Sequence, residues 1–258
     1  DADRKELGLS YGQDKVITAL AKANKNLIVV NISGNAIAMP WVKEVPAIVQ
    51  AWYLGSEAGS AIASVLTGDV NPSGKLPFTF PASLQDVGAH KLGEYPGTPR
   101  NYGSPIVDQK YNEGIFVGYR WADKEKTKPL FSFGHGLSYT TFAYGKAIAD
   151  KKVMGQDETL TITLPVTNTG SREGSEVIQL YISDLKSSLP RPVKELKGFS
   201  KVKLAPGETR EVTFTIGKEA LSFFDDARHE WVAEPGKFEA WIGASSTDIR
   251  NKVAFKLK

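Results

Sequence analysis

The sequence predicts an α/β layer followed by an all-β sandwich, and three observations support this prediction. In the first part of the chain, apolar residues at helical spacing alternate with unbroken apolar runs. From about residue 138 the pattern changes to alternation of apolar and polar residues. Turns rich in Gly and Pro separate these later runs, as they do in sheets of short strands. The change near Tyr139 is therefore the main division in the sequence.

Two helices are predicted in the first part. Residues 10–25 place apolar side chains on one helical face, and Ser10 is the expected N-cap. Residues 56–69 form a second apolar stripe, with Ser56 as the expected cap and Gly68 as the stop.

Extended segments lie between and after these helices. Residues 26–34 are an unbroken apolar run typical of a strand buried on both faces, and residues 45–55 repeat the pattern. This order of elements indicates a mostly parallel sheet with flanking helices. In residues 71–81, NPSGKLPFTFP, the first four residues predict a turn whose glycine supplies any positive φ. Pro77 then limits the segment to an edge or irregular strand, and residues 82–114 predict a long surface excursion.

The last part of the chain predicts a β-sandwich without helices. Short alternating strands joined by regular turns are typical of a sandwich of about 120 residues. The strands are expected at residues 159–168, 176–184, 210–216, 237–243 and 252–258.

Composition excludes several classes of function. The chain has no cysteine, so neither disulfides nor thiolate metal sites can form. Its 32 basic and 29 acidic side chains are spread evenly, which argues against a nucleic-acid surface. No apolar run is long enough to span a membrane. The three histidines, His90, His135 and His229, are not spaced like the ligands of a metal ion, so no metal site and no cofactor are expected. His135 is interpreted as a hydrogen-bonded structural residue.

Two carboxylates are candidates for contact with a substrate. Glu57 lies in the first turn of a helix after a buried strand, where it either opposes the helix dipole or faces a ligand. Glu113 is expected between the surface excursion and a strand, where it either pairs with Arg120 or contacts substrate. The structural interpretation is favoured for both. No acid and nucleophile pair of the kind that cleaves a glycosidic bond emerges from the residues.

Four aromatic residues offer a second type of site. Trp41, Trp52, Tyr53 and Trp121 could line a sugar platform, but the apolar neighbours of Trp41 and Trp52 favour core packing for those two.

Several stretches closely resemble the C-terminal half of glycoside hydrolase family 3, the β-glucosidase family. They span nearly the whole chain in family order: DRKELGLSYGQDKVI, VPAIVQAWYLGSEAGSAIASVLTGDVNPSGKLPFTFP, YNEGIFVGYRW, PLFSFGHGLSYTTF, RPVKELKGFSKVKLAPGET and EPGKFEAWIGASS. The resemblance implies that residues 1–85 are the C-terminal part of an α/β sandwich domain. Residues 86–137 would be an inter-domain loop and connecting strand, and residues 138–258 a fibronectin type III-like β-sandwich.

The resemblance also implies a retaining, exo-acting mechanism. An Asp of an N-terminal (β/α)8-type barrel would attack the anomeric carbon, and a Glu of the α/β sandwich domain would protonate the leaving oxygen. In relatives this Glu lies a few residues before an Asp-Arg pair, which Asp3-Arg4 match, so it is expected just upstream of Asp1. No catalytic residue is thus expected within the chain, which begins without Met and reads as the interior of a longer protein.

The implied function is hydrolysis of terminal β-D-glucosyl residues once the chain is assembled with its N-terminal barrel. The chain alone is expected to be inactive. The alternatives are a non-catalytic carbohydrate- or protein-binding module, or a β-xylosidase or N-acetylglucosaminidase of the same family. An uncovered apolar face would favour aggregation or a homodimer. The family resemblance favours a periplasmic or secreted protein of bacterial source.

Overall fold

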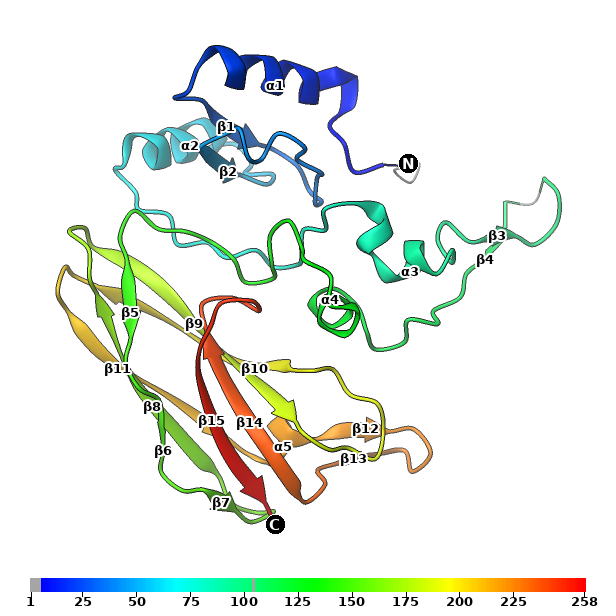
Figure 1. Cartoon of the computed structure of the whole chain (residues 1–258), viewed down its shortest axis with the longest axis vertical. Helices are drawn as coiled ribbons and strands as arrows, with labels where there is room; N and C mark the ends of the chain where they lie inside the picture. Colours follow the sequence, from blue (N-terminus) through cyan, green and yellow to red (C-terminus); the bar gives the residue numbers. More distant parts are fainter. Residues whose placement is uncertain (1–5, 104) are drawn as a thin grey trace. The chain divides into compact units, whose positions relative to one another are not determined.

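The computed structural model describes residues 6–103 and 105–258, which form two compact units (Figure 1). The first unit runs to Val70 and resumes over Phe78–Ser132. The second unit combines Asn71–Pro77 with Phe133–Lys258. The chain therefore enters the second unit briefly, returns to the first, and then completes the second.

The first unit contains the predicted helices and parallel strands. A short 3-10 turn, η1 (Ser10–Gly12), leads into α1 (Gln13–Ala23), and β1 (Ile28–Asn31) and β2 (Ala47–Gln50) follow. These strands pair in parallel with Ile28 opposite Ala47, which confirms the parallel prediction. Helix α2 (Ala58–Thr67) completes this part of the unit.

The predicted N-caps are wrong, whereas the predicted stop is confirmed. Ser10 lies in η1, and α1 begins after Gly12, which adopts a left-handed conformation. The N-cap of α2 is Glu57 rather than Ser56. Gly68 ends α2 with φ of 83°, a conformation that glycine adopts without steric cost.

The predicted burial of both strand faces is wrong for the part of the chain that the structure describes. Ile28 and Ile32 are 49% and 61% exposed, and no residue of α2 is buried. The reason is that only two strands of this sheet are described, so their outer edges and faces have few neighbours.

The rest of the first unit is less regular. It contains η2 (Leu84–Asp86), α3 (Gly88–Lys91), β3 (Thr98–Pro99), β4 (Val107–Asp108) and α4 (Tyr119–Glu125). The predicted surface excursion thus holds short elements. The strand expected after Glu113 is wrong: the chain forms α4 there, which begins after Gly118 and buries Trp121.

The segment Asn71–Pro81 is extended and irregular, as Pro77 predicted. Phe80 forms an isolated antiparallel bridge with Phe131, in which the Phe80 backbone N donates to the Phe131 carbonyl at 2.8 Å. The predicted turn at its start is wrong, because residues 71–76 have no assigned turn and Gly74 is not left-handed. Contacts of Asn71 and Lys75, described below, hold this part of the chain instead.

The second unit is a sandwich of two sheets. One has the strand order β10-β9-β14-β15-β7, and the other has β11-β8-β5 with β6 also paired to β8. All pairings in these sheets are antiparallel except that of β15 with β7. Their bounds are β5 (Phe142–Tyr144), β6 (Ile148–Ala149), β7 (Val153–Met154), β8 (Leu160–Asn168), β9 (Gly174–Asp184), β10 (Glu195–Leu204), β11 (Thr209–Ile216), β14 (Gly236–Gly243) and β15 (Ile249–Leu257).

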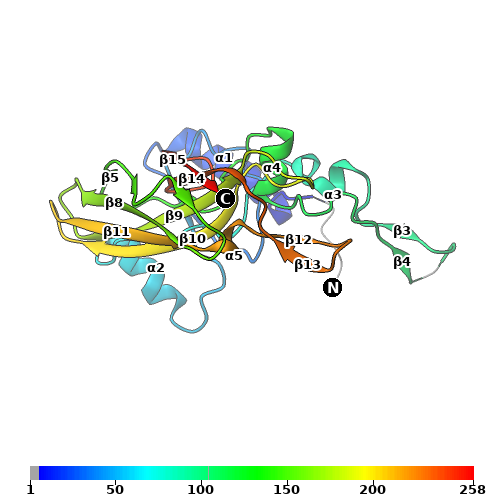
Figure 2. The ribbon, with the colours of Figure 1, turned by 90° about the horizontal axis from the view of Figure 1, so that it is seen from below.

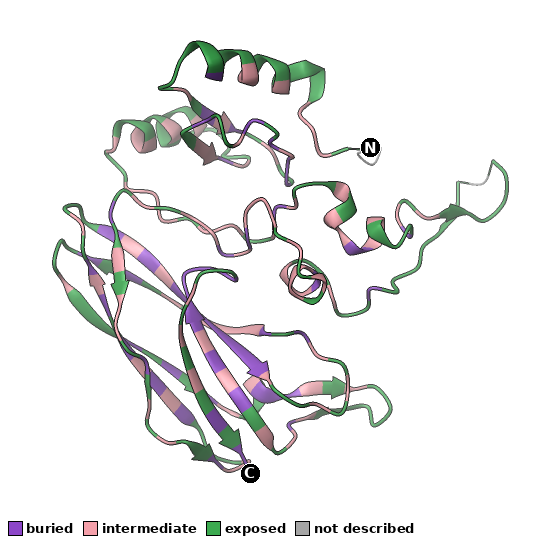
Figure 3. Cartoon of the chain, viewed as in Figure 1, coloured by how far each residue is buried: buried purple, intermediate pink, exposed green. Residues whose placement is uncertain are grey.

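The alternating pattern produces the core of this unit. In β8 every second side chain from Leu160 to Val166 is fully buried, and Phe238, Ala240 and Ile242 of β14 are buried as well. Figure 3 shows this as buried segments that recur along the strands. Each large apolar side chain buried in this way stabilises the fold by about 1.5–3 kcal/mol.

Several elements of the second unit were not predicted, among them the short strands β5, β6 and β7. Strand β10 lies in a lysine-rich stretch whose polar residues hide the alternation. The short helix α5 (Lys218–Leu221) contradicts the expectation of no helices. It leads into a separate hairpin of β12 (Phe223–Asp225) and β13 (Glu230–Val232), which extends from the sandwich in Figure 2.

Candidate functional site

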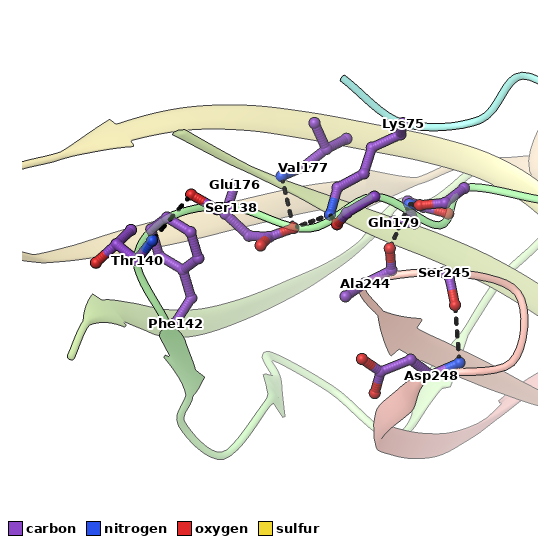
Figure 4. A network of polar contacts seen from close by, with 12 residues as sticks. Lys75, Ser138, Thr140, Phe142, Glu176, Val177, Gln179, Ala244, Ser245 and Asp248 are labelled. Carbon is purple, nitrogen blue, oxygen red and sulfur yellow. Dashed lines mark hydrogen bonds and ion pairs between the residues drawn. The ribbon is translucent and has the colours of Figure 1, made fainter. Parts of the chain in front are cut away.

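A buried ion pair holds the segment Asn71–Pro77 against the sandwich of the second unit (Figure 4). Lys75 Nζ lies 2.9 Å from Glu176 Oε1 of β9, and the two side chains are 12% and 8% exposed. The same ammonium donates to the Gly136 carbonyl at 2.7 Å. Glu176 Oε1 also accepts from the backbone N of Val177. Because both charges are paired and hydrogen-bonded, their burial is tolerated.

Asn71 anchors the start of the same segment. Its Oδ1 accepts from Ser138 Oγ at 2.9 Å and from the Tyr139 backbone N at 2.8 Å. Its Nδ2 donates to the Glu173 carbonyl at 2.9 Å. One amide side chain thus joins two segments that are far apart in the sequence.

Gln179 of β9 completes this polar junction, by which we mean Asn71, Lys75, Glu176, Gln179 and their partners. Gln179 Nε2 donates to the carbonyls of Gly134 and Ala244 at 3.1 and 2.8 Å, and its Oε1 accepts from Tyr181 Oη at 2.6 Å. Gly134 has φ of 80°, and a Cβ there would overlap the Gln179 amide. The junction therefore requires glycine at this position.

His135 lies within the polar junction. Its carbonyl accepts from the Leu76 backbone N at 2.8 Å. Burial lowers the pKa of His135, and the positive charge of Lys75 lowers it further, while Asp248 acts in the opposite direction. The ring therefore favours its neutral form. This geometry fastens the chain rather than assembling reactive groups, and it gives the segment NPSGKLPFTFP a structural role.

Glu57 lies at the N-cap of α2 and is exposed. Its carboxylate accepts from Ser60 Oγ at 3.1 Å and makes no capping hydrogen bond to the backbone. Its backbone carbonyl accepts from the Ala61 N at 3.0 Å, which starts the helix. The side chain is therefore open to solvent and able to meet another group.

Glu113 is buried in the first unit, with 8% of its surface exposed. Its Oε2 accepts no hydrogen bond from Arg120 or any other described residue, and the indole Nε1 of buried Trp121 also lacks an acceptor among them. A Cβ at position 88 would lie 3.0 Å from the Trp121 ring and 3.2 Å from Glu113 Cβ, so Gly88 permits this close packing. The first unit thus buries one acceptor and one donor that have no hydrogen-bond partner among the described residues.

A second buried carboxylate, Glu94, was not predicted from the sequence. It accepts from the backbone N of Asn112 at 3.0 Å and from the side-chain amide of the same residue. A lone Glu in a stretch rich in Gly and Pro gives no periodic signal, so only the structure identifies it.

The four aromatic candidates separate into buried and accessible residues. Trp41 is buried and donates through Nε1 to Asp14 Oδ1 at 2.6 Å, which confirms core packing. Trp121 is also buried, and Trp52 packs edge-on against Phe78 and Phe80. Tyr53 alone of the four is strongly exposed. They do not form one common platform.

Neither clustered metal ligands nor a helix that could span a membrane occurs among the described residues. No group of three or more His, Asp or Glu side chains there is arranged to hold a metal ion. Within the same ranges, every helix is too short or too polar to cross a bilayer.

The family profile described as the glycosyl hydrolase family 3 C-terminal domain matches residues 1–139, and a fibronectin type III-like profile matches residues 176–246. The chain belongs to glycoside hydrolase family 3. Residues 1–5, which include the Asp3-Arg4 pair of the family pattern, lie outside the residues that the structure describes.

Relatives of this family 3 chain are similar along nearly all of it. A Bacteroides ovatus protein named β-glucosidase BoGH3A is 54% identical over 256 residues, which cover 98% of this chain and 33% of the relative. The thermostable β-glucosidase B of Acetivibrio thermocellus is 41% identical over 249 residues, or 96% of this chain and 32% of its own.

Solved structures show the same similarity. The Kluyveromyces marxianus β-glucosidase in complex with glucose has a TM-score of 0.89 and 41% identity, covering 99% of this chain and 30% of that one. The Bifidobacterium adolescentis family 3 β-glucosidase has a TM-score of 0.90 and 34% identity, and the match covers 99% of this chain and 36% of that one. The family 3 chain thus spans about a third of the length of these relatives.

Proposed function

We propose that this chain is the C-terminal part of a retaining, exo-acting β-glucosidase that releases terminal β-D-glucosyl residues. The observation that supports this most is the 54% identity, over 98% of the chain, to a protein named as a β-glucosidase. The chain supplies part of the α/β sandwich domain and the fibronectin-like unit. An N-terminal (β/α)8-type barrel supplies the Asp nucleophile, and the acid/base Glu precedes Asp3-Arg4.

Two carboxylates of the chain are proposed to face that assembly. Glu57 is exposed at the start of α2, and Glu113 has a buried oxygen without a hydrogen-bond donor among the described residues. Leaving a buried carboxylate oxygen unsatisfied costs stability, so a donor from substrate or from the rest of the protein would be favourable at Glu113.

Complementation tests the main proposal. The chain is mixed with the N-terminal two thirds of BoGH3A, and hydrolysis of an aryl β-glucoside is compared with that of the aryl β-xyloside and β-N-acetylglucosaminide. We expect turnover only with the mixture and fastest with the glucoside. Turnover by the chain alone would overturn the proposal, and saccharide binding without any turnover would favour a non-catalytic module.

The two carboxylates are tested in the same mixture. Glu57→Gln and Glu113→Gln are compared with Glu211→Gln, an exposed residue of β11. A substrate contact predicts a loss of turnover of about tenfold or more with an unchanged Tm. A purely structural role predicts unchanged turnover per folded molecule and, for buried Glu113, a lowered Tm.

A further inference from the structure

The hairpin of β12 and β13 displays two aromatic side chains to solvent. Phe224 and Trp231 are opposite each other in the antiparallel register and therefore lie on one face of the hairpin. Trp231 is 69% exposed and Phe224 is 48% exposed. Their ring centroids are 5.7 Å apart with an interplanar angle of 67°, an edge-to-face contact that fixes the rings relative to each other.

The opposite face of the hairpin is anchored to the sandwich through Arg191. The Arg191 side chain is 5% exposed and pairs with Asp184 at 3.1 Å and with Glu195 at 2.7 Å. It also donates to the Leu221 carbonyl at 2.8 Å, and its guanidinium lies 5.5 Å from the centre of the Phe223 ring. Phe223 therefore faces the protein while its neighbour Phe224 faces outward. This support holds the exposed pair in place before any ligand arrives.

Charged residues flank the turn of the hairpin, and Asp225 and Glu230 are opposite each other on the face that carries Phe223. Asp225 Oδ1 accepts from the backbone N of Ala227 and of Arg228, which fixes the turn. Arg228 lies 3.3 Å from Asp225 Oδ2 and 4.0 Å from Glu230 Oε1. The guanidinium is thus balanced by carboxylates, so this surface does not select an anionic ligand.

The exposed aromatic face matches the chemistry of a β-linked glucose chain. In β-D-glucopyranose the hydroxyl groups are equatorial, so both ring faces present C–H groups that stack on an indole. We propose that the exposed face formed by Phe224 and Trp231 is a binding site for β-glucan chains. The choice of a β-linked glucan rests on the proposed β-glucosidase function.

Calorimetric titration of the chain with cellohexaose tests this site, with maltohexaose as the α-linked control. We expect measurable binding of cellohexaose and weaker binding of maltohexaose. Trp231→Ala should weaken cellohexaose affinity by about tenfold or more, and Trp231→Phe, which keeps an aromatic face, by about threefold. Phe199→Ala removes another aromatic residue that is 69% exposed, on β10, and should leave affinity unchanged.

Several outcomes would overturn the site. The first is that the wild-type chain does not bind cellohexaose, and the second is that Trp231→Ala binds it as tightly as the wild type. The third is that Phe199→Ala loses as much cellohexaose affinity as Trp231→Ala although circular dichroism shows that all variants are folded. If Trp231→Ala instead dissociates a dimer in sedimentation without changing cellohexaose affinity, the aromatic pair is a protein contact and the proposal is wrong. Aryl-glucoside turnover in the complemented enzyme is measured separately, so failure here leaves the proposed function standing.

Discussion

At the scale of single residues, the ion pair of Lys75 with Glu176 is a buried contact whose loss should be costly. Lys75→Met leaves the Glu176 carboxylate buried without its cation, and breaking a buried pair in this way costs about 3–5 kcal/mol. Lys203→Met is the matched control, because its pair with Glu173 is exposed and should contribute about 0–1 kcal/mol. Urea unfolding measures both. Equal effects of the two substitutions would contradict the assigned role of the polar junction.

The pKa of His135 predicts how stability responds to pH. Because its pKa is lowered in the folded state, the unfolded chain binds the proton more readily, and folding stability is lost as pH falls below about 6.5. In His135→Gln this contribution is absent. We therefore expect the free energy of unfolding of the wild type to fall relative to that of His135→Gln as the pH is lowered from about 7 to 5, as measured by urea unfolding. Parallel pH curves would show that His135 does not titrate as proposed.

At the scale of elements, the turn through Gly134 should be less tolerant of a side chain than an open turn. Gly134 and Gly207 have φ of 80° and 75°, so alanine at either position meets a similar backbone cost of about 1–2 kcal/mol. A Cβ at Gly207 meets nothing within 4 Å, whereas at Gly134 it overlaps Gln179. Gly134→Ala should therefore lower Tm clearly more than Gly207→Ala. Equal losses in thermal unfolding would mean that Gln179 moves aside freely.

At the scale of the whole molecule, exposed apolar residues of the first unit predict self-association of the chain. Val16 and Leu20 on α1 and Ile28 on β1 are among them. Val16→Lys with Leu20→Lys should shift sedimentation toward the monomer, because charged side chains oppose association. Ile148→Lys, at an exposed position of the second unit, is the control and should have no effect. A wild-type chain that is already a stable monomer at high concentration would contradict this prediction.

The sequence predicted the fold best where a local pattern is the direct consequence of burial. The alternation in β8 and β14 is visible without coordinates because one face of each strand packs in the core. Helix α4 and strand β10 were missed because their polar and aromatic residues follow no clean period. The candidate site was harder still, since Glu94 and the Phe224–Trp231 pair have no distinguishing local pattern.

The sequence by itself determined the order of α/β and all-β parts, the positions of the long sandwich strands other than β10, and the family to which the chain belongs. These depend on residue spacing and on motifs, which are properties of neighbouring residues. Only the tertiary structure decided that Lys75 pairs with Glu176, that Glu113 is buried with an unsatisfied oxygen, and that Trp231 remains in solvent. The partners in such contacts lie far apart along the chain, and folding alone sets whether a given charge or ring meets protein or water.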